Sequence, residues 1–125
     1  KNLDYAHGTG HGVGFFLNVH EGPQAISKYN KVPIKKGMVL SNEPGYYLNN
    51  NYGIRIENLI YVDELNKNLI FKNLTLAPID IDMINFKMLN KHERKYLFYY
   101  HLDVYAKISK YLNNEEKKWL LKLIK

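Results

Sequence analysis

The sequence of 125 residues contains no cysteine. A disulfide framework, a thiolate metal site and a cysteine nucleophile are therefore excluded. No apolar run approaches the roughly 20 residues that a membrane-spanning helix needs, so no membrane partner is expected. Arginine is scarce as well, since Arg55 and Arg94 are the only two. Because nucleic-acid readers favour the planar arginine fork, the net charge of +6 is interpreted as dispersed surface lysine, and no nucleic-acid partner is expected.

Several common catalytic motifs are absent too. The glycine-rich run at residues 8–14 is not a dinucleotide fingerprint, because Val13 stands where the third glycine belongs, and no phosphate-binding lysine follows it. His20 has no second histidine four residues on, which excludes the helical zinc-protease motif. Ser27 and Ser41 lack the flanking glycines of a nucleophile elbow. Serine-based catalysis is therefore not the expected chemistry.

The overall composition is that of a folded chain. Hydrophobic residues make up 46% and aromatic residues 14%, including eleven tyrosines. This content exceeds that of disordered segments, and the length suffices for one modest core. The chain starts with lysine and not with methionine. We therefore expect a processed chain or a piece of a longer protein.

Three histidines and two glutamates lie in unusually glycine-rich or proline-rich surroundings: His7, His11, His20, Glu43 and Glu57. Imidazole nitrogen and carboxylate oxygen together suit divalent ions such as manganese, zinc, cobalt or iron. The flanking glycines allow backbone to approach a bound group closely. Two alternatives remain open at this point. The histidines could be incidental members of a glycine-rich turn, or the two glutamates could be the carboxylate pair of a glycoside hydrolase.

The pattern of apolar and turn-forming residues predicts a meandering antiparallel sheet in the first part of the chain. Extended segments are predicted at residues 13–20, 38–43, 46–48, 54–62 and 69–77. Strand alternation places Arg55 and Glu57 on the same side of their strand. If segment 38–43 pairs with segment 54–62, Glu43 and Glu57 can converge on one site.

After about residue 84 the pattern becomes helical. Asn90 and Glu93 form a predicted capping box, and apolar residues then recur at helical spacing as far as Leu112. A second cap at residues 113–116 precedes another apolar stripe at residues 119–124. His92 and His101 fall on this helical part. We interpret them as a surface residue and a helix-face residue, not as metal ligands.

Taken together, these blocks resemble metallopeptidases with the pita-bread fold, and among them the aminopeptidase P (Xaa-Pro aminopeptidase) branch. The resemblance rests on residues 7–14, 17–23, 37–39, 42–47 and 53–58, with further similarity at 74–79 and 100–102. It implies an α+β fold, in which the C-terminal half of a pita-bread domain forms a curved antiparallel sheet at residues 1–83. A helical C-terminal extension then covers residues 84–125.

The resemblance also implies a site and a reaction. His11, Glu43 and Glu57 correspond to three of the family's five metal ligands, with Glu57 bridging two divalent ions. The implied ions are manganese, with zinc or cobalt as alternatives. His7, His20 and Arg55 correspond to residues that line the substrate site, and His7, His20 and Glu43 to residues that assist catalysis. The implied reaction removes the first residue of a peptide with proline second, using a metal-activated water.

The sequence departs from the family pattern at one important point. The two remaining ligands are aspartates upstream of the first histidine motif, and only Asp4, in a different context, precedes His7. We therefore expect the longer parent protein to be the enzyme and this chain alone to be inactive. The resemblance further implies a cytoplasmic homodimer. A prolidase-type dipeptidase and a non-catalytic peptide-binding module of the same fold remain alternatives.

Overall fold

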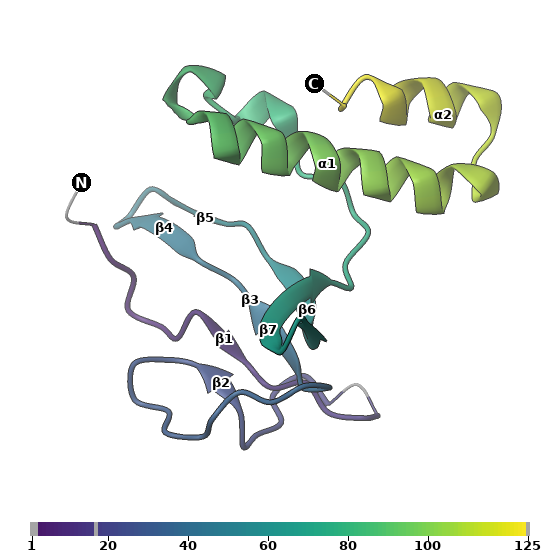
Figure 1. Cartoon of the computed structure of the whole chain (residues 1–125). Coiled ribbons are helices and arrows are strands. Elements are labelled where there is room, and N and C mark those ends of the chain that lie inside the picture. The colour runs from purple at the N-terminus through teal and green to yellow at the C-terminus, as the bar shows by residue number, and fades with distance from the viewer. Residues whose placement is uncertain (1–2, 17, 125) are drawn as a thin grey trace. The chain divides into compact units, whose positions relative to one another are not determined.

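The computed structural model describes residues 3–16 and 18–124, and the chain divides into two compact units at residues 1–75 and 76–125 (Figure 1). The strands belong to the first unit and the helices to the second. This succession of antiparallel strands and helices is the predicted α+β class. The boundary predicted from the sequence, between residues 83 and 84, stays a prediction. No helix in the described part of the chain is long and apolar enough to cross a membrane.

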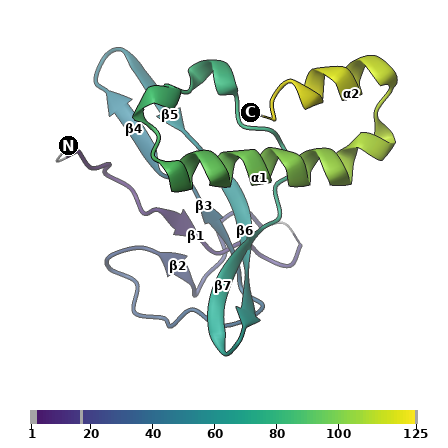
Figure 2. The ribbon, with the colours of Figure 1, turned by 45° about the horizontal axis from the view of Figure 1, so that its top comes forward.

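The first unit is built from antiparallel strand pairs. The strands are β1 (Gly10–His11), β2 (Ala25–Ile26), β3 (Val39–Asn42), β4 (Gly45–Leu48), β5 (Tyr52–Arg55), β6 (Asn58–Leu65) and β7 (Asn68–Asn73). β1 pairs with β2, β4 pairs with β5, and β6 lies between β3 and β7. Figure 2 shows β6 and β7 as a long twisted hairpin.

One register runs through the two strand pairs that carry the glutamates. In the β3–β6 pair Asn42 lies opposite Asn58, and in the β4–β5 pair Gly45 lies opposite Arg55. Both strand pairs therefore follow the same register. They are two parts of one hairpin, and its pairing is interrupted between them. Continued across that interruption, the register places Glu43 opposite Glu57. The predicted pairing of segment 38–43 with segment 54–62 is therefore confirmed.

Pro44 explains why the hairpin is interrupted. It falls opposite Ile56 in the common register, and the Ile56 N–H donates to the Pro44 carbonyl at 3.3 Å. In a regular antiparallel ladder Pro44 would also donate a hydrogen bond to Ile56, but proline has no N–H. The prediction of one strand over residues 54–62 is therefore wrong. β5 ends at Arg55, and β6 begins at Asn58.

Alternation along the hairpin separates an apolar face from a polar face. Leu40, Ile60 and Val62 are almost fully buried and form the core of this unit, where Ile34 and Met38 pack against them. The intervening positions point to the opposite side of the sheet. Those positions include residues 41, 43, 55 and 57, so the candidate ligands share the face that the core does not occupy.

Two predicted strands differ from the structure. Segment 13–20 is not a strand in its described residues, because the Gly14 N–H donates to the Asn18 carbonyl at 2.8 Å and closes a turn. Phe15 and Phe16 are both 90% exposed, which fits a loop. The last predicted strand ends at Asn73 and not at residue 77, although the backbone N–H groups of Leu74 and Thr75 still donate to the Leu59 carbonyl of β6.

The second unit confirms the predicted helices and their caps. It contains the 3₁₀ turns η1 (Ile81–Met83), η2 (Phe86–Met88) and η3 (Ser109–Tyr111), and the helices α1 (Lys91–Ile108) and α2 (Asn114–Leu121). Asn90 and Asn113 both complete capping boxes. α2 turns back beside the second half of α1 (Figures 1 and 2), and Tyr100, Val104 and Leu120 form the buried core.

His101 lies within this helical core and is fully buried. Its Nε2 lies 3.1 Å from both the backbone nitrogen and the carbonyl oxygen of Ile79. The ring therefore fixes the segment before α1 against the helix. This placement agrees with its interpretation as a helix-face residue. His92 is exposed in the first turn of α1, as the sequence predicts.

Candidate metal centre

His11, Ser41 and Glu43 form a connected group on the polar face of the hairpin. His11 ends β1, and its Nε2 lies 3.3 Å from the Glu43 Oε1. Ser41 is fully buried in β3, accepts a hydrogen bond from the His11 backbone N–H and donates one to Glu43 Oε1, both at 2.9 Å. The strand β1 and the end of β3 thus hold an imidazole and a carboxylate side by side.

The hydrogen bonds of His11 indicate how its ring is oriented. Its Nδ1 lies 2.9 Å from the Gly12 carbonyl oxygen, which can only accept, so Nδ1 carries a proton. In the neutral ring, Nε2 then presents its lone pair towards the Glu43 carboxylate. Two facing electron pairs repel unless a cation lies between them. A backbone carbonyl that orients the distal nitrogen is also the usual arrangement of metal-binding histidines.

The spacing of these two donors fits one metal ion. Ligand atoms about 2.1 Å from an ion, at tetrahedral to octahedral angles, lie about 3.0–3.4 Å apart, and the observed separation is 3.3 Å. Within residues 3–16 and 18–124, however, no group of three His, Asp or Glu side chains is placed to hold a metal. The structure thus brings together His11 and Glu43, and Glu57 as the third ligand stays a prediction.

Glycine is required where the segment containing β1 runs antiparallel alongside β3. A Cβ added at Gly10 would overlap the Ser41 carbonyl oxygen, and one added at Gly12 would overlap the Glu21 carbonyl oxygen. Backbone contact this close leaves no room for a side chain. The glycine-rich run therefore serves to press β1 against β3 and the following loop. This close approach is what brings His11 to Glu43.

His20 lies beside His11. The two ring centroids are 4.1 Å apart with an angle of 46° between the rings, and the His20 side chain is exposed. It comes from the loop between β1 and β2, close to the turn that Gly14 and Asn18 form. His20 therefore lies next to a candidate ligand, and its roles in substrate binding and catalysis stay predictions.

The remaining predicted residues form a second group around Tyr47. His7 Nε2 lies 2.6 Å from the Tyr47 hydroxyl, and His7 Nδ1 donates to the Gly8 carbonyl at 2.7 Å. Arg55 Nε lies 3.7 Å from Glu57 Oε2, as their shared face predicts. A hydrogen bond to Tyr47 raises the pKa of Arg55, and the nearby Glu57 and Glu43 carboxylates add to this effect. Tyr47, Gly53, Arg55 and Glu57 line a hollow of about 450 Å³.

Ser41 and Tyr47 belong to the site, although the sequence argument gave neither a role. Ser41 links two candidate ligands, and Tyr47 links His7 to the hollow around Glu57. A usable signal was present. Ser41 and Tyr47 lie an even number of residues from Glu43. Because side chains alternate along a strand, all three are expected on the same face of the sheet.

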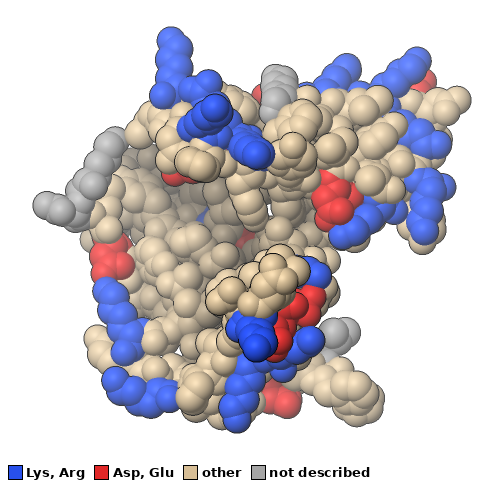
Figure 3. Space-filling view, in the orientation of Figure 1, with Lys and Arg blue, Asp and Glu red and all other residues tan. Residues whose placement is uncertain are grey.

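The surface charge gathers at no single place on the face drawn in Figure 3. Lysine and arginine side chains are scattered over the surface and interspersed with acidic ones. The basic side chains of Lys28 and Lys72 each pair with an aspartate, at 2.8 Å and 2.6 Å. These two lysines are thus locally balanced, and neither pairs with a candidate ligand.

Sequence comparisons identify close relatives of the chain. "Probable Xaa-Pro aminopeptidase P" of Coprinopsis cinerea is 46% identical over 131 residues, which cover 94% of this chain and 21% of the relative. An uncharacterized peptidase of Schizosaccharomyces pombe is 47% identical over 131 residues, which cover 96% of this chain and 22% of the relative. The chain therefore spans about a fifth of the length of the curated relatives it matches.

The fold also has a solved counterpart. The crystal structure of an X-prolyl aminopeptidase from Caenorhabditis elegans, described as a cytosolic enzyme with a di-nuclear active site, superposes with a TM-score of 0.89. It is 39% identical, and the match covers 99% of this chain and 22% of that one. The predicted fold, the C-terminal half of a pita-bread domain with a helical extension, is confirmed by this match.

Models of protein families account for nearly the whole sequence. Residues 1–64 match the model of metallopeptidase family M24, and residues 67–125 match the model of the C-terminal region of the same peptidases. The first match covers more than half of the chain and includes each predicted site residue. The chain therefore belongs to metallopeptidase family M24.

Proposed function

We propose that the protein containing this chain is a metal-dependent aminopeptidase that releases the first residue from peptides with proline in second position. The observation that carries the proposal is the pairing of His11 Nε2 with Glu43 Oε1 at 3.3 Å, in a hairpin whose register sets Glu57 opposite Glu43. Directly opposed carboxylates destabilise a hairpin unless a cation balances them. The names of the fungal and nematode relatives support the specificity for proline.

In this proposal His11, Glu43 and Glu57 would contribute ligands to two divalent ions. The di-nuclear site of the Caenorhabditis elegans relative supports the number of ions. Manganese is the proposed metal, with zinc or cobalt as alternatives, since imidazole and carboxylate accept each of them. When bound, the ions polarise the substrate carbonyl and lower the pKa of water towards neutrality.

The other side chains then have separate tasks. Glu43 accepts a proton from the attacking water and passes it to the leaving imino nitrogen of proline. His20, beside His11, donates a hydrogen bond to the oxygen of the reacting carbonyl. His7 and Arg55 line the substrate site, where the hydrogen bond between His7 and Tyr47 limits the movement of the imidazole ring.

The test uses the full-length protein loaded with manganese. We expect hydrolysis of a tripeptide with proline second, and little hydrolysis when alanine replaces that proline. Glu57→Gln should abolish activity and the second bound ion, whereas Glu64→Gln, an exposed change on β6, should preserve both. Cleavage of Xaa-Pro dipeptides alone would instead indicate a prolidase. Peptide binding without any hydrolysis would indicate a non-catalytic module and refute the proposal.

The location and the oligomeric state of the protein are each proposed from a single observation. The cytosolic description of the Caenorhabditis elegans relative supports a cytoplasmic enzyme. Homodimerisation follows only from the resemblance to aminopeptidase P, and light scattering of the full-length protein would test it. A monomeric mass across a range of concentrations would contradict this assignment.

A further inference from the structure

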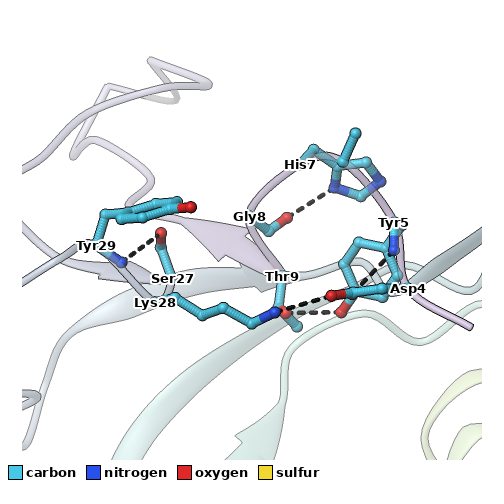
Figure 4. A pocket seen from close by; sticks show the side chains of 9 residues that line it. Asp4, Tyr5, His7, Gly8, Thr9, Ser27, Lys28 and Tyr29 are labelled. Atoms are coloured by element: carbon cyan, nitrogen blue, oxygen red, sulfur yellow. Dashed lines mark hydrogen bonds and ion pairs between the residues drawn. The ribbon is translucent and has the colours of Figure 1, made fainter. Parts of the chain in front are cut away.

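A second hollow lies outside the group of candidate ligands. Its volume is about 390 Å³, and it is lined by residues 4–9 and by residues 27–29 of the loop after β2 (Figure 4). Figure 4 shows the two segments facing each other, with the Lys28 side chain reaching across to Asp4. Apart from His7, none of the predicted catalytic or metal-binding residues lines this hollow.

His7 connects this hollow to the proposed active site. His7 lines the hollow and contacts Tyr47, and Tyr47 lines the other hollow, which contains Glu57. The hydrogen-bonded pair of His7 and Tyr47 therefore lies between the two hollows. An aminopeptidase substrate has only one residue before the cleaved bond, so every longer peptide extends on the leaving-group side. The hollow lined by His7 offers space for that extension.

The lining combines aromatic rings with one ion pair. Tyr5 and Tyr29 offer ring surfaces, and the Tyr29 side chain is largely exposed. Lys28 Nζ lies 2.8 Å from Asp4 Oδ2. Lysine is charged at neutral pH, and a hydrogen bond to Asp4 raises the pKa of Lys28 further. Since an ammonium group has three N–H donors, Lys28 can contact a second carboxylate while it keeps its contact with Asp4.

We propose that this hollow is a substrate subsite for the peptide beyond its proline, and that Lys28 gives it a preference for a carboxylate. This inference rests on the proposed aminopeptidase function. The carboxylate can belong to an acidic side chain or to the C-terminus of a tripeptide, because both present the same two oxygens. Asp4 moderates the preference, since it shares the ammonium and repels a second anion.

The experiment compares matched peptides on the full-length, manganese-loaded protein. One pair carries glutamate or glutamine after the proline and an amidated C-terminus. The other pair carries glycine there, with a free or an amidated C-terminus. We expect a two- to fivefold higher kcat/KM for the carboxylate-bearing peptide of one pair, about the value of an exposed ion pair. The pair that shows the preference identifies which carboxylate is bound.

Two variants and one control test the residues. Lys28→Gln should remove the preference through KM with kcat unchanged, and Asp4→Asn should increase it. Lys31→Gln, an exposed change near the same loop but outside the lining, should leave it unchanged. Equal kcat/KM values within both peptide pairs, or a preference that survives Lys28→Gln, would overturn the proposal.

A binding measurement separates this proposal from the proposed activity. The same peptides are titrated calorimetrically into metal-free full-length protein, in which no turnover is expected. Tighter binding of the carboxylate-bearing peptide that Lys28→Gln abolishes supports the subsite even if no peptide is hydrolysed. Hydrolysis of proline peptides without such discrimination would retain the proposed function and reject the subsite.

Discussion

Ser41 holds the two candidate ligands in place. It is fully buried, and its hydroxyl both accepts from the His11 backbone and donates to the Glu43 carboxylate. Groups that orient metal ligands in this way often influence affinity almost as strongly as the ligands themselves. The geometry of His11 and Glu43 thus depends on a residue that would not contact the metal.

Replacing Ser41 by alanine should therefore reduce both stability and metal affinity. The partly buried His11 N–H would lose its partner, which costs about 1 kcal/mol in the free energy of unfolding. Manganese affinity of the full-length protein should fall about 10- to 100-fold. Urea unfolding and calorimetric titration measure the two effects. Ser109→Ala, in the helical unit, is the control, and equal manganese affinities of the two variants would contradict this role.

At the level of single residues, the sequence indicated the ligand types but only part of their arrangement. His11 and Glu43 could be proposed from their chemistry and the family resemblance. Their contact depends on how closely β1 approaches β3, which Gly10 permits because a Cβ there would overlap the Ser41 backbone. Such a long-range backbone contact leaves no periodic signal in a sequence. The link from His7 to Tyr47 spans 40 positions and was equally hidden.

At the level of secondary-structure elements, local signals succeeded where one pattern governed a whole segment. The capping boxes at Asn90 and Asn113 start both helices as predicted. Prediction failed where a distant partner decides the structure. β5 and β6 separate because Pro44, on the other strand, cannot donate a hydrogen bond, and residues 54–62 contain no breaker of their own.

The β6–β7 hairpin should lose stability in acid through Asp63. A hydrogen bond from Lys72 lowers the pKa of this carboxyl, and the Glu64 backbone N–H adds to the effect. A carboxyl whose pKa is lowered by folding stabilises the folded protein at pH values above its pKa in the unfolded chain, which is about 4. This stabilisation is lost as the pH falls through the pKa of the carboxyl in the folded protein. Asp63→Asn should therefore unfold at a lower urea concentration than the wild type at pH 7, with a difference that shrinks as pH falls below about 4.

Urea midpoints measured between pH 7 and pH 2.5 check this expectation. Asp103→Asn provides a comparison, because it removes a surface ion pair with Lys107 in the helical unit and leaves β6 and β7 intact. A difference between wild type and Asp63→Asn that stays constant over the whole pH range would show that Asp63 acts through packing and not through its charge.

At the scale of the whole molecule, this chain contains only part of the expected metal centre. Calorimetric titration of manganese into the 125-residue chain should show at most one weak site, since the described residues bring together two donors and not three. Glu57→Ala should change this weak binding little, because Glu57 is expected to contribute mainly when a second ion is present. Two tight sites in the chain alone would contradict the expected need for further ligands.

One strand register of the hairpin determines both the burial of the core and the alignment of the candidate ligands. The same alternation that buries Leu40 and Ile60 sets Ser41, Glu43 and Glu57 on the opposite face. A slip of one residue in either strand would bring a glutamate onto the apolar side and expose the core. A misregistered hairpin would therefore be too unstable to persist as a folded but inactive species. Selection for a stable fold alone would suffice to keep the glutamates aligned.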